Sequence, residues 1–146
     1  MATVVADNTT KVLANDPSDL PDVKDHDGNL RVQSDVYEAS GLTAGSTIAI
    51  AYLPNGAKVK EIIIDHDALG SSSTLACGDA DTAARYIAAS STSSAGTLRL
   101  SAIGGRNFQV QTEDASGDDT RRILLTTAGA TINGTIKSTV VYSVDG

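Results

Sequence analysis

Apolar residues recur at every second position along most of this chain, which is the spacing of a half-buried β-strand. The clearest case spans residues 135–144, where Ile136, Val140, Tyr142 and Val144 fall on one face together with Ser138. Polar residues fill most of the opposite face. We therefore expect a strand here that buries one of its two faces.

Residues 47–53 repeat this alternation, with Ile48, Ile50 and Tyr52 on the expected inner face. The segment Pro54-Asn55-Gly56 follows directly, and its residue types favour a tight turn. The sequence thus predicts that the chain reverses here and that the next strand pairs with this one in a β-hairpin.

The returning strand spans residues 58–65, which alternate at first and then become continuously apolar at Ile62-Ile63-Ile64. A continuous apolar run indicates either a strand covered on both faces or a β-bulge that interrupts the alternation. The pattern leaves both alternatives open.

Short segments of the same kind recur at regular spacing and bring the total to about nine. The others are residues 32–38, 74–78, 85–89, 97–102, 107–112 and 122–127. Short strands separated by turn signals every ten or so residues predict an all-β fold, an antiparallel two-sheet sandwich of jelly-roll-like type. One stretch has a competing interpretation, a helix over residues 79–88, because Asp79 could cap it and its alanines favour helix.

Residues 1–30 differ from the rest of the chain. They contain Pro17 and Pro21 and show no sustained apolar period, which predicts an extended, irregular N-terminal arm ahead of a single sandwich domain over residues 31–146. Fully extended, such an arm could span roughly 100 Å and reach a neighbouring subunit. A disordered tail is the alternative.

The chain of 146 residues is long enough to bury one core, and its composition narrows the possible partners. Its 18 acidic and 11 basic residues give a formal net charge of −7, which disfavours binding to nucleic acid or to an anionic membrane. The N-terminus lacks the basic start and apolar run of a secretory signal, so we expect synthesis and retention in a cytosol-like compartment. Cys77 is the single cysteine, which excludes an intrachain disulfide.

Two triplets, Asp25-His26-Asp27 and Asp65-His66-Asp67, are the closest approach to a metal site. On an extended segment, successive side chains point to opposite faces, so a single triplet cannot chelate an ion. A site would need both triplets together, or a carboxylate such as Asp79 or Asp81. We expect solvated turn residues and no metal.

The acidic loop over residues 113–119 offers the hard oxygen ligands that calcium prefers, but it lacks the spacing of an EF-hand loop. We expect a solvated hairpin tip, which could also meet a basic patch on a partner. Arg121-Arg122, immediately beyond, would partly neutralise it.

Catalytic motifs are missing from the sequence. It contains no G-x-S-x-G elbow and no phosphate-binding glycine loop, and Gly104-Gly105-Arg106 is expected to be a turn. Cys77 has no histidine near it in sequence, which favours a small buried thiol. We therefore expect no catalytic residue and no cofactor, and a protein that is not an enzyme.

Several turn-and-strand phrases follow one another in a characteristic order. They are Val36-Tyr37-Glu38-Ala39-Ser40-Gly41-Leu42, Leu53-Pro54-Asn55-Gly56-Ala57, Asp67-Ala68-Leu69-Gly70-Ser71-Ser72-Ser73-Thr74-Leu75, Gly78-Asp79-Ala80-Asp81, Arg85-Tyr86-Ile87, Ile123-Leu124-Leu125-Thr126, Gly134-Thr135-Ile136-Lys137 and Val141-Tyr142. With these phrases the chain resembles small virion structural proteins of tailed bacteriophages, of the capsid decoration or cement type. The resemblance implies a β-sandwich, often a homotrimer, that is made in the host cytoplasm and seated on the outer capsid surface. It implies the major capsid protein as partner and no catalytic residue.

The leading hypothesis from the sequence is thus a phage capsid decoration protein whose arm extends to neighbouring subunits. The alternative is a tail, connector or fibre-associated virion protein with loops that bind a host glycan. The scarcity of aromatic residues for stacking on sugars, with Phe108 and four tyrosines in all, argues against glycan binding. A third hypothesis, a small hydrolase or metal-binding lectin, would use the two Asp-His-Asp triplets.

Overall fold

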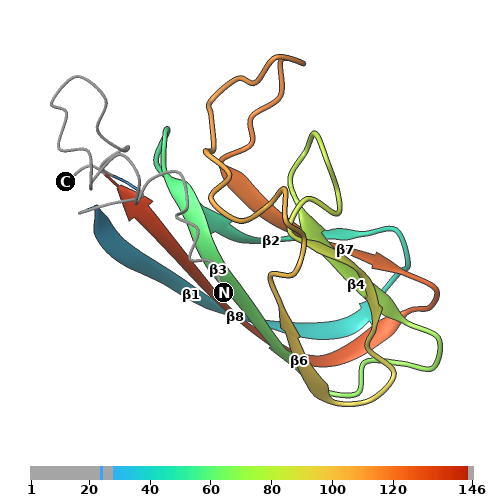
Figure 1. Cartoon of the computed structure of the whole chain (residues 1–146). Helices are drawn as coiled ribbons and strands as arrows, with labels where there is room; N and C mark the ends of the chain where they lie inside the picture. The colour runs from blue at the N-terminus through green and yellow to red at the C-terminus, as the bar shows by residue number, and fades with distance from the viewer. Residues whose placement is uncertain (1–23, 25–27, 145–146) are drawn as a thin grey trace, which may run out of the picture.

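The computed structural model describes Lys24 and residues 28–144, and these residues form two four-stranded antiparallel sheets that face each other (Figure 1). This part of the chain contains eight strands and no helix. The strands are β1 (Asn29–Leu42), β2 (Thr47–Tyr52), β3 (Lys58–His66), β4 (Thr74–Gly78), β5 (Ile87–Ser91), β6 (Gly96–Arg99), β7 (Arg122–Ala128) and β8 (Ile132–Val144). The predicted all-β antiparallel sandwich is confirmed.

The chain crosses between the sheets at almost every connection. One sheet has the order β1-β8-β3-β6 and the other the order β2-β7-β4-β5, so that β4 and β5 are the one pair of consecutive strands within a sheet. This alternation gives the jelly-roll-like arrangement expected from the sequence.

The core lies between the sheets, and its central element is β8. This strand pairs with β1 on one side and β3 on the other, and it buries Ile136, Val140 and Tyr142 on its inner face, as the alternation predicts. Buried residues of the opposite sheet, such as Leu125 of β7, complete the same cluster. Ser143 on the outer face is also buried, and its hydroxyl donates to the Lys24 carbonyl at 2.8 Å.

The predicted hairpin between residues 47–53 and 58–65 is wrong, because β2 pairs with β7 and β3 pairs with β8 and β6. The turn exists, with the Ala57 amide donating to the Pro54 carbonyl at 3.1 Å. Gly56 has a φ of +86°, but Asn55 does not adopt a positive φ. A positive φ at the second central residue alone defines a type II turn, whereas the common two-residue type I′ hairpin needs it at both. The turn therefore carries the chain across to the other sheet.

Tyr52 was predicted to face inward and is exposed. The register between β2 and β7 shifts between Ala49 and Ala51, so that Ile50 and Ala51 are both buried and the next side chain points outward. A bulge reverses the alternation downstream of itself in this way. β3 also contains a bulge, between Val59 and Glu61, but it lies ahead of the apolar run. Ile62 to Ile64 pair with β8 in unbroken register, with Ile62 and Ile64 buried and Ile63 half-buried on the other face, so the run itself contains no bulge.

The expected strand over residues 107–112 is not a strand of either sheet. The segment runs beside the start of β3 and exchanges single hydrogen bonds with it, such as Val110 amide to Ala57 carbonyl at 2.9 Å. Asn107 adopts a left-handed φ of 65°, which breaks the extended conformation that a continuous ladder needs. β5 starts two residues later than expected, and β6 ends at Arg99.

The N-terminal arm lies mostly outside the described residues. β1 begins at Asn29, so the last residues assigned to the arm from the sequence already belong to the sheet. The extended arm and the division of the chain at residue 30 stay predictions.

Candidate functional site

The loop after β4 is organised by one buried carboxylate and contains no helix. Asp79 accepts hydrogen bonds from the amides of Asp81 at 3.0 Å and Thr82 at 2.8 Å, and its other oxygen accepts from Arg85 Nε at 2.5 Å. Asp79 does cap a turn, as its residue type favours, but the chain then enters β5 instead of continuing as a helix.

Arg85 links this loop to the core. Its guanidinium stacks over the Phe108 ring, 3.9 Å from the centroid, and its second amino group contacts Asp81 at 3.0 Å. Burial lowers the pKa of Arg85, but the hydrogen bond and charge of Asp79 outweigh this effect and raise the pKa above its ordinary value. The arginine is thus a structural cation tied to two carboxylates.

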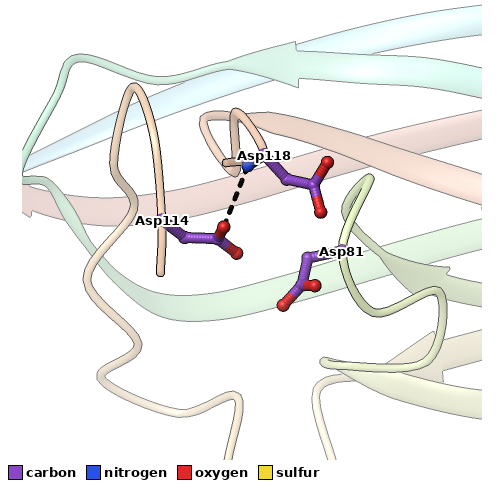
Figure 2. Close-up of side chains that lie close together, drawn as sticks. All are labelled: Asp81, Asp114 and Asp118. Carbon is purple, nitrogen blue, oxygen red and sulfur yellow. Dashed lines mark hydrogen bonds between the residues drawn. The ribbon is translucent and has the colours of Figure 1, made fainter. Parts of the chain in front are cut away.

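Three carboxylates converge where this loop meets the acidic loop over residues 113–119 (Figure 2). Asp81 comes from the loop after β4, whereas Asp114 and Asp118 lie in the acidic loop. Each offers one oxygen, and the three oxygens lie within 4.8 Å of one another. These residues form the group of three within the described residues that could hold a metal ion, and their hard oxygens suit calcium.

The acidic loop folds on itself through Asp114, whose carboxylate accepts from the amides of Ser116 at 2.8 Å and Asp118 at 2.9 Å. The backbone hydrogen bond from Asp118 is the main cause that lowers the pKa of Asp114. Desolvation, followed by the negative charges of Asp114 and Asp81, raises the pKa of Asp118. These local bonds account for the shape of the loop without an ion.

The second Asp-His-Asp triplet, Asp65-His66-Asp67, does not contribute to this group. Asp25-His26-Asp27 lies outside the described residues. His66 is buried, with Nδ1 2.8 Å from the Asp67 carbonyl oxygen, and the flanking carboxylates are engaged separately. Asp65 accepts from Thr97 Oγ1 at 2.7 Å, and Asp67 accepts from the Thr135 amide at 3.0 Å. The second triplet therefore stabilises strand ends. The sequence indicates Asp81 only as a possible partner of the triplets and does not predict that it meets the acidic loop.

Cys77 lies in the core, where burial, followed by the charge of Asp79, raises the pKa of its thiol to about 12. A thiol that stays protonated is a poor nucleophile. The Gly104-Gly105-Arg106 segment is a turn, as expected, and the Arg106 guanidinium donates to the carbonyls of Lys60 and Leu100.

Arg121 neutralises one residue of the acidic loop, as the sequence suggested. It contacts Asp119 at 3.0 Å, stacks over the Tyr52 ring at 4.7 Å and donates to the tyrosine hydroxyl. The side-chain hydrogen bond from Arg121 is the main cause that lowers the pKa of Asp119 to about 2.

A groove with a volume of about 510 Å³ lies between the edge strands β1 and β2. Residues 32–35 and 49–52 line it, with Arg122 of β7 beside them. We call it the edge groove. Its lining contains no histidine or cysteine, and Asp35 is its one carboxylate. No local pattern in the sequence indicates this groove beyond the two strands that line it.

No membrane-crossing helix can be drawn from the described residues, because none of them is helical. No known protein-family profile matches the chain, and no curated protein matches it.

Solved structures share the fold. A chain of the capsid asymmetric unit of cyanophage Pam1 has a TM-score of 0.66 and 23% identity, over 80% of this chain and 86% of its own. A chain of the capsid of Ralstonia phage GP4 has a TM-score of 0.63 and 20% identity, over 80% and 84%. A chain of the acid-stable capsid of Helicobacter pylori bacteriophage KHP30 has a TM-score of 0.56 and 12% identity, over 80% and 89%. At these identities the likeness establishes a common sandwich fold.

Proposed function

We propose that this chain is a non-enzymatic structural protein of a bacteriophage virion, and that it acts as a decoration or cement protein on the outer surface of the capsid. It binds the major capsid protein, as a homotrimer, and stabilises the head shell. The observation that carries this proposal is the likeness to chains from the capsids of three phages, over at least four-fifths of both partners in each comparison.

The share of each chain that the structural match covers also indicates what kind of capsid component this chain is. Because the matched region is 80% of this chain and 84–89% of the other chains, all four have similar lengths. The likeness is therefore to small whole chains that consist mostly of one sandwich. A small accessory subunit suits this size, and the origin of all three matched chains in phage capsids favours a head position over a tail, connector or fibre position.

The chemistry of the described residues supports a binding role. The reactive side chains are already engaged within the fold. Cys77 is buried and protonated, the Asp79 carboxylate accepts hydrogen bonds from backbone amides and Arg85, and the His66 ring contacts the Asp67 carbonyl at a strand end. By contrast, the edge groove and the adjoining strand offer a stiff surface to a neighbour. A net charge of −7 suits the outside of a shell and disfavours contact with packaged DNA.

The proposal is tested with heads that lack this chain. Purified protein is added, and bound protein is measured by sedimentation while head stability is measured as the temperature of DNA release. We expect saturable binding at a fixed number of copies per head and a higher release temperature. Absence of binding, or binding that leaves the release temperature unchanged, would refute the cement role. Cryo-microscopy of the virion should locate the chain on the head, and a location on the tail would select the alternative.

The arm is tested by deleting residues 2–23, which leaves Lys24 and its contact with Ser143 in place. We expect unchanged melting of the sandwich and weaker attachment to heads, because an arm that becomes ordered on a neighbour adds contacts. Equal affinity of the shortened chain would show that the arm takes no part in attachment.

A further inference from the structure

Strand β1 stands at the edge of its sheet, and most of its length is exposed (Figure 1). It pairs with β8 along one side, and no other described strand pairs with its second side. The edge groove borders residues 32–35, so this side of the strand is open to a partner. Leu30, Val32 and Val36 are 67%, 58% and 59% exposed. A long, open and partly apolar edge favours pairing with another strand.

The free backbone groups of β1 belong to its even-numbered residues. The Val36 amide donates to the Asp35 side chain at 2.8 Å, so the ladder with β8 does not use it. In an antiparallel strand, the amide and carbonyl of one residue point to the same side, and successive residues alternate. The register with β8 is unbroken over this stretch, so the amides and carbonyls of Leu30, Val32 and Ser34 also point to the open edge. An added strand would meet donors and acceptors at these positions.

The sequence of this edge is complementary to itself when two copies run in opposite directions. With Gln33 opposite its own copy, Arg31 lies opposite Asp35 of the second copy on one face of the joined sheets. The pairs on the other face are uncharged, and they are Leu30 with Val36 and Val32 with Ser34. Opposite charges and apolar side chains that face each other across two strands stabilise their pairing.

The two charged residues of this edge have no partner for each other within one chain. Arg31 and Asp35 share a face but lie four positions apart, which is roughly 13 Å along a strand. Neither of them forms an ion pair among the described residues. Residues 29–37 contain this one base and this one acid, so the segment is neutral. Two chains with a net charge of −7 can therefore meet here without added repulsion.

Other registers lack this agreement. A twofold axis at Asp35 places two carboxylates directly opposite each other, which is destabilising. An axis at Ser34 places the apolar Leu30 opposite Glu38. The axis at Gln33 opposes charges of unlike sign, and it also brings even-numbered residues opposite even-numbered ones, so that free donors meet free acceptors.

We propose that two copies of this chain pair through the open edges of β1, antiparallel and with a twofold axis at Gln33. The two sheets join into one continuous sheet, in which the even-numbered residues exchange backbone hydrogen bonds. The Asp35 carboxylate exchanges the Val36 amide for Arg31 of the second copy, and that amide then donates to a carbonyl of the second strand. Because both copies use the same surface, the contact closes with two copies and covers both edges.

This contact is additional to the proposed homotrimer. A twofold contact joins copies in pairs, so on a shell it links one trimer to the next. The inference is argued from β1 alone and goes beyond the proposed function without resting on it.

Three full-length cysteine variants test the register. In Gln33→Cys, the new thiol faces its own copy across the axis. Arg31→Cys and Asp35→Cys face each other but not themselves, because equal positions lie roughly 13 Å apart, too far for a disulfide. Ile103→Cys is the matched control, because Ile103 is 95% exposed in a loop outside the strands. The native Cys77 is buried and takes no part.

Each variant is oxidised, and covalent dimers are measured by electrophoresis without reductant, after thermal melting has verified the fold. We expect Gln33→Cys, and the mixture of Arg31→Cys with Asp35→Cys, to crosslink roughly tenfold or more faster than Ile103→Cys, because a bound partner holds the second thiol at high effective concentration. Arg31→Cys alone should match the control. Control rates for both Gln33→Cys and the mixture would overturn the proposal, and so would rapid crosslinking of Arg31→Cys alone.

A charge exchange tests the same contact without cysteines. Arg31→Asp and Asp35→Arg each place two pairs of like charges across the axis, whereas the double variant restores unlike pairs. We expect each single variant to weaken association roughly tenfold or more in analytical ultracentrifugation, and the double variant to associate like the parent. An equimolar mixture of the two single variants should associate as well. Unchanged association of the single variants, or failure of the double variant to recover, would contradict the register.

Failure of this inference and failure of the proposed function have different signatures. A chain whose Gln33→Cys variant crosslinks rapidly but which does not bind heads would refute the cement role alone. A chain that binds and stabilises heads, while both Gln33→Cys and the mixture crosslink no faster than Ile103→Cys in solution and on heads, would refute the pairing of β1 alone.

Discussion

Replacement of Asp79 by alanine should destabilise the sandwich more than any other single change in its loops. The side chain is fully buried and accepts the amides of Asp81 and Thr82 together with Arg85 Nε. Alanine leaves these donors without an acceptor and leaves the arginine, 16% exposed, without its main counter-charge. The loss of these hydrogen bonds should therefore loosen both the loop and the adjacent end of the core, where β4 and β5 pair.

The expected size follows from the burial of this pair. Removal of one partner from a buried ion pair costs about 3–5 kcal/mol, because the other charge stays buried. Arg85 can turn to Asp81, which its guanidinium already contacts at 3.0 Å, so we expect the lower end of the range, about 3 kcal/mol. For a domain of this size, that loss corresponds to a fall in Tm of roughly 10–15 °C.

The assay is urea unfolding followed by circular dichroism, with the free energy of unfolding compared between variants. Asp81→Ala is the matched control, because it removes an exposed partner of the same arginine and should cost no more than about 1 kcal/mol. Equal losses for both variants, or a loss below about 1 kcal/mol for Asp79→Ala, would show that the buried carboxylate does not organise the loop as argued.

Three further predictions follow from single residues. Gly129→Ala should lower the free energy of unfolding in urea by roughly 2 kcal/mol or more beyond the loss caused by Gly45→Ala. Both glycines have a φ of +85°, but a Cβ at Gly129 would lie 2.0 Å from the Ser72 carbonyl oxygen, whereas a Cβ at Gly45 would meet open space. Equal losses for the two variants would exclude the clash. Cys77 should react with a thiol reagent only at the rate of unfolding, because burial raises its pKa to about 12; rapid labelling of the folded chain would contradict this. The pKa of Asp119 is about 2 in the folded chain against an ordinary value of 3.8, so this carboxylate should add stability above about pH 4 that is lost as the pH falls towards 2. The free energy of unfolding of Asp119→Asn should therefore change less between pH 4 and pH 2 than that of the parent chain. An unchanged dependence on pH would contradict this prediction.

The sequence predicted the class of fold because alternation is a local property that burial preserves. Strand β4 was predicted with its observed bounds, and the inner face of β8 was predicted with its residues in place. It could not predict which strands pair, since a type I′ hairpin turn and a type II turn differ in the backbone angles of Asn55, and both fit Pro54-Asn55-Gly56.

The groupings that cross the fold could not be found from the sequence either. Asp81 and Asp114 are 33 positions apart, and they meet because Arg85 and Asp79 hold one loop in place while the other folds on its own carboxylate. No local pattern encodes that meeting. Tyr52 shows the same limit at shorter range, because a single bulged residue moves it from the core to the surface.

The unequal strand lengths connect the fold to the proposed assembly. A sandwich with sheets of equal length would cover the inner face of β1 and expose only its outer edge. Here β1 and β8 are about twice as long as β2 and β7, so part of β1 has no strand opposite it, and Leu30, Val32 and Val36 of this edge strand are exposed. A long, exposed apolar edge strand would be a liability for a monomer, because it promotes unwanted pairing. If shortening β1 by removal of residues up to Val32 left a stable sandwich that no longer associates, the overhang would be shown to serve assembly and not folding.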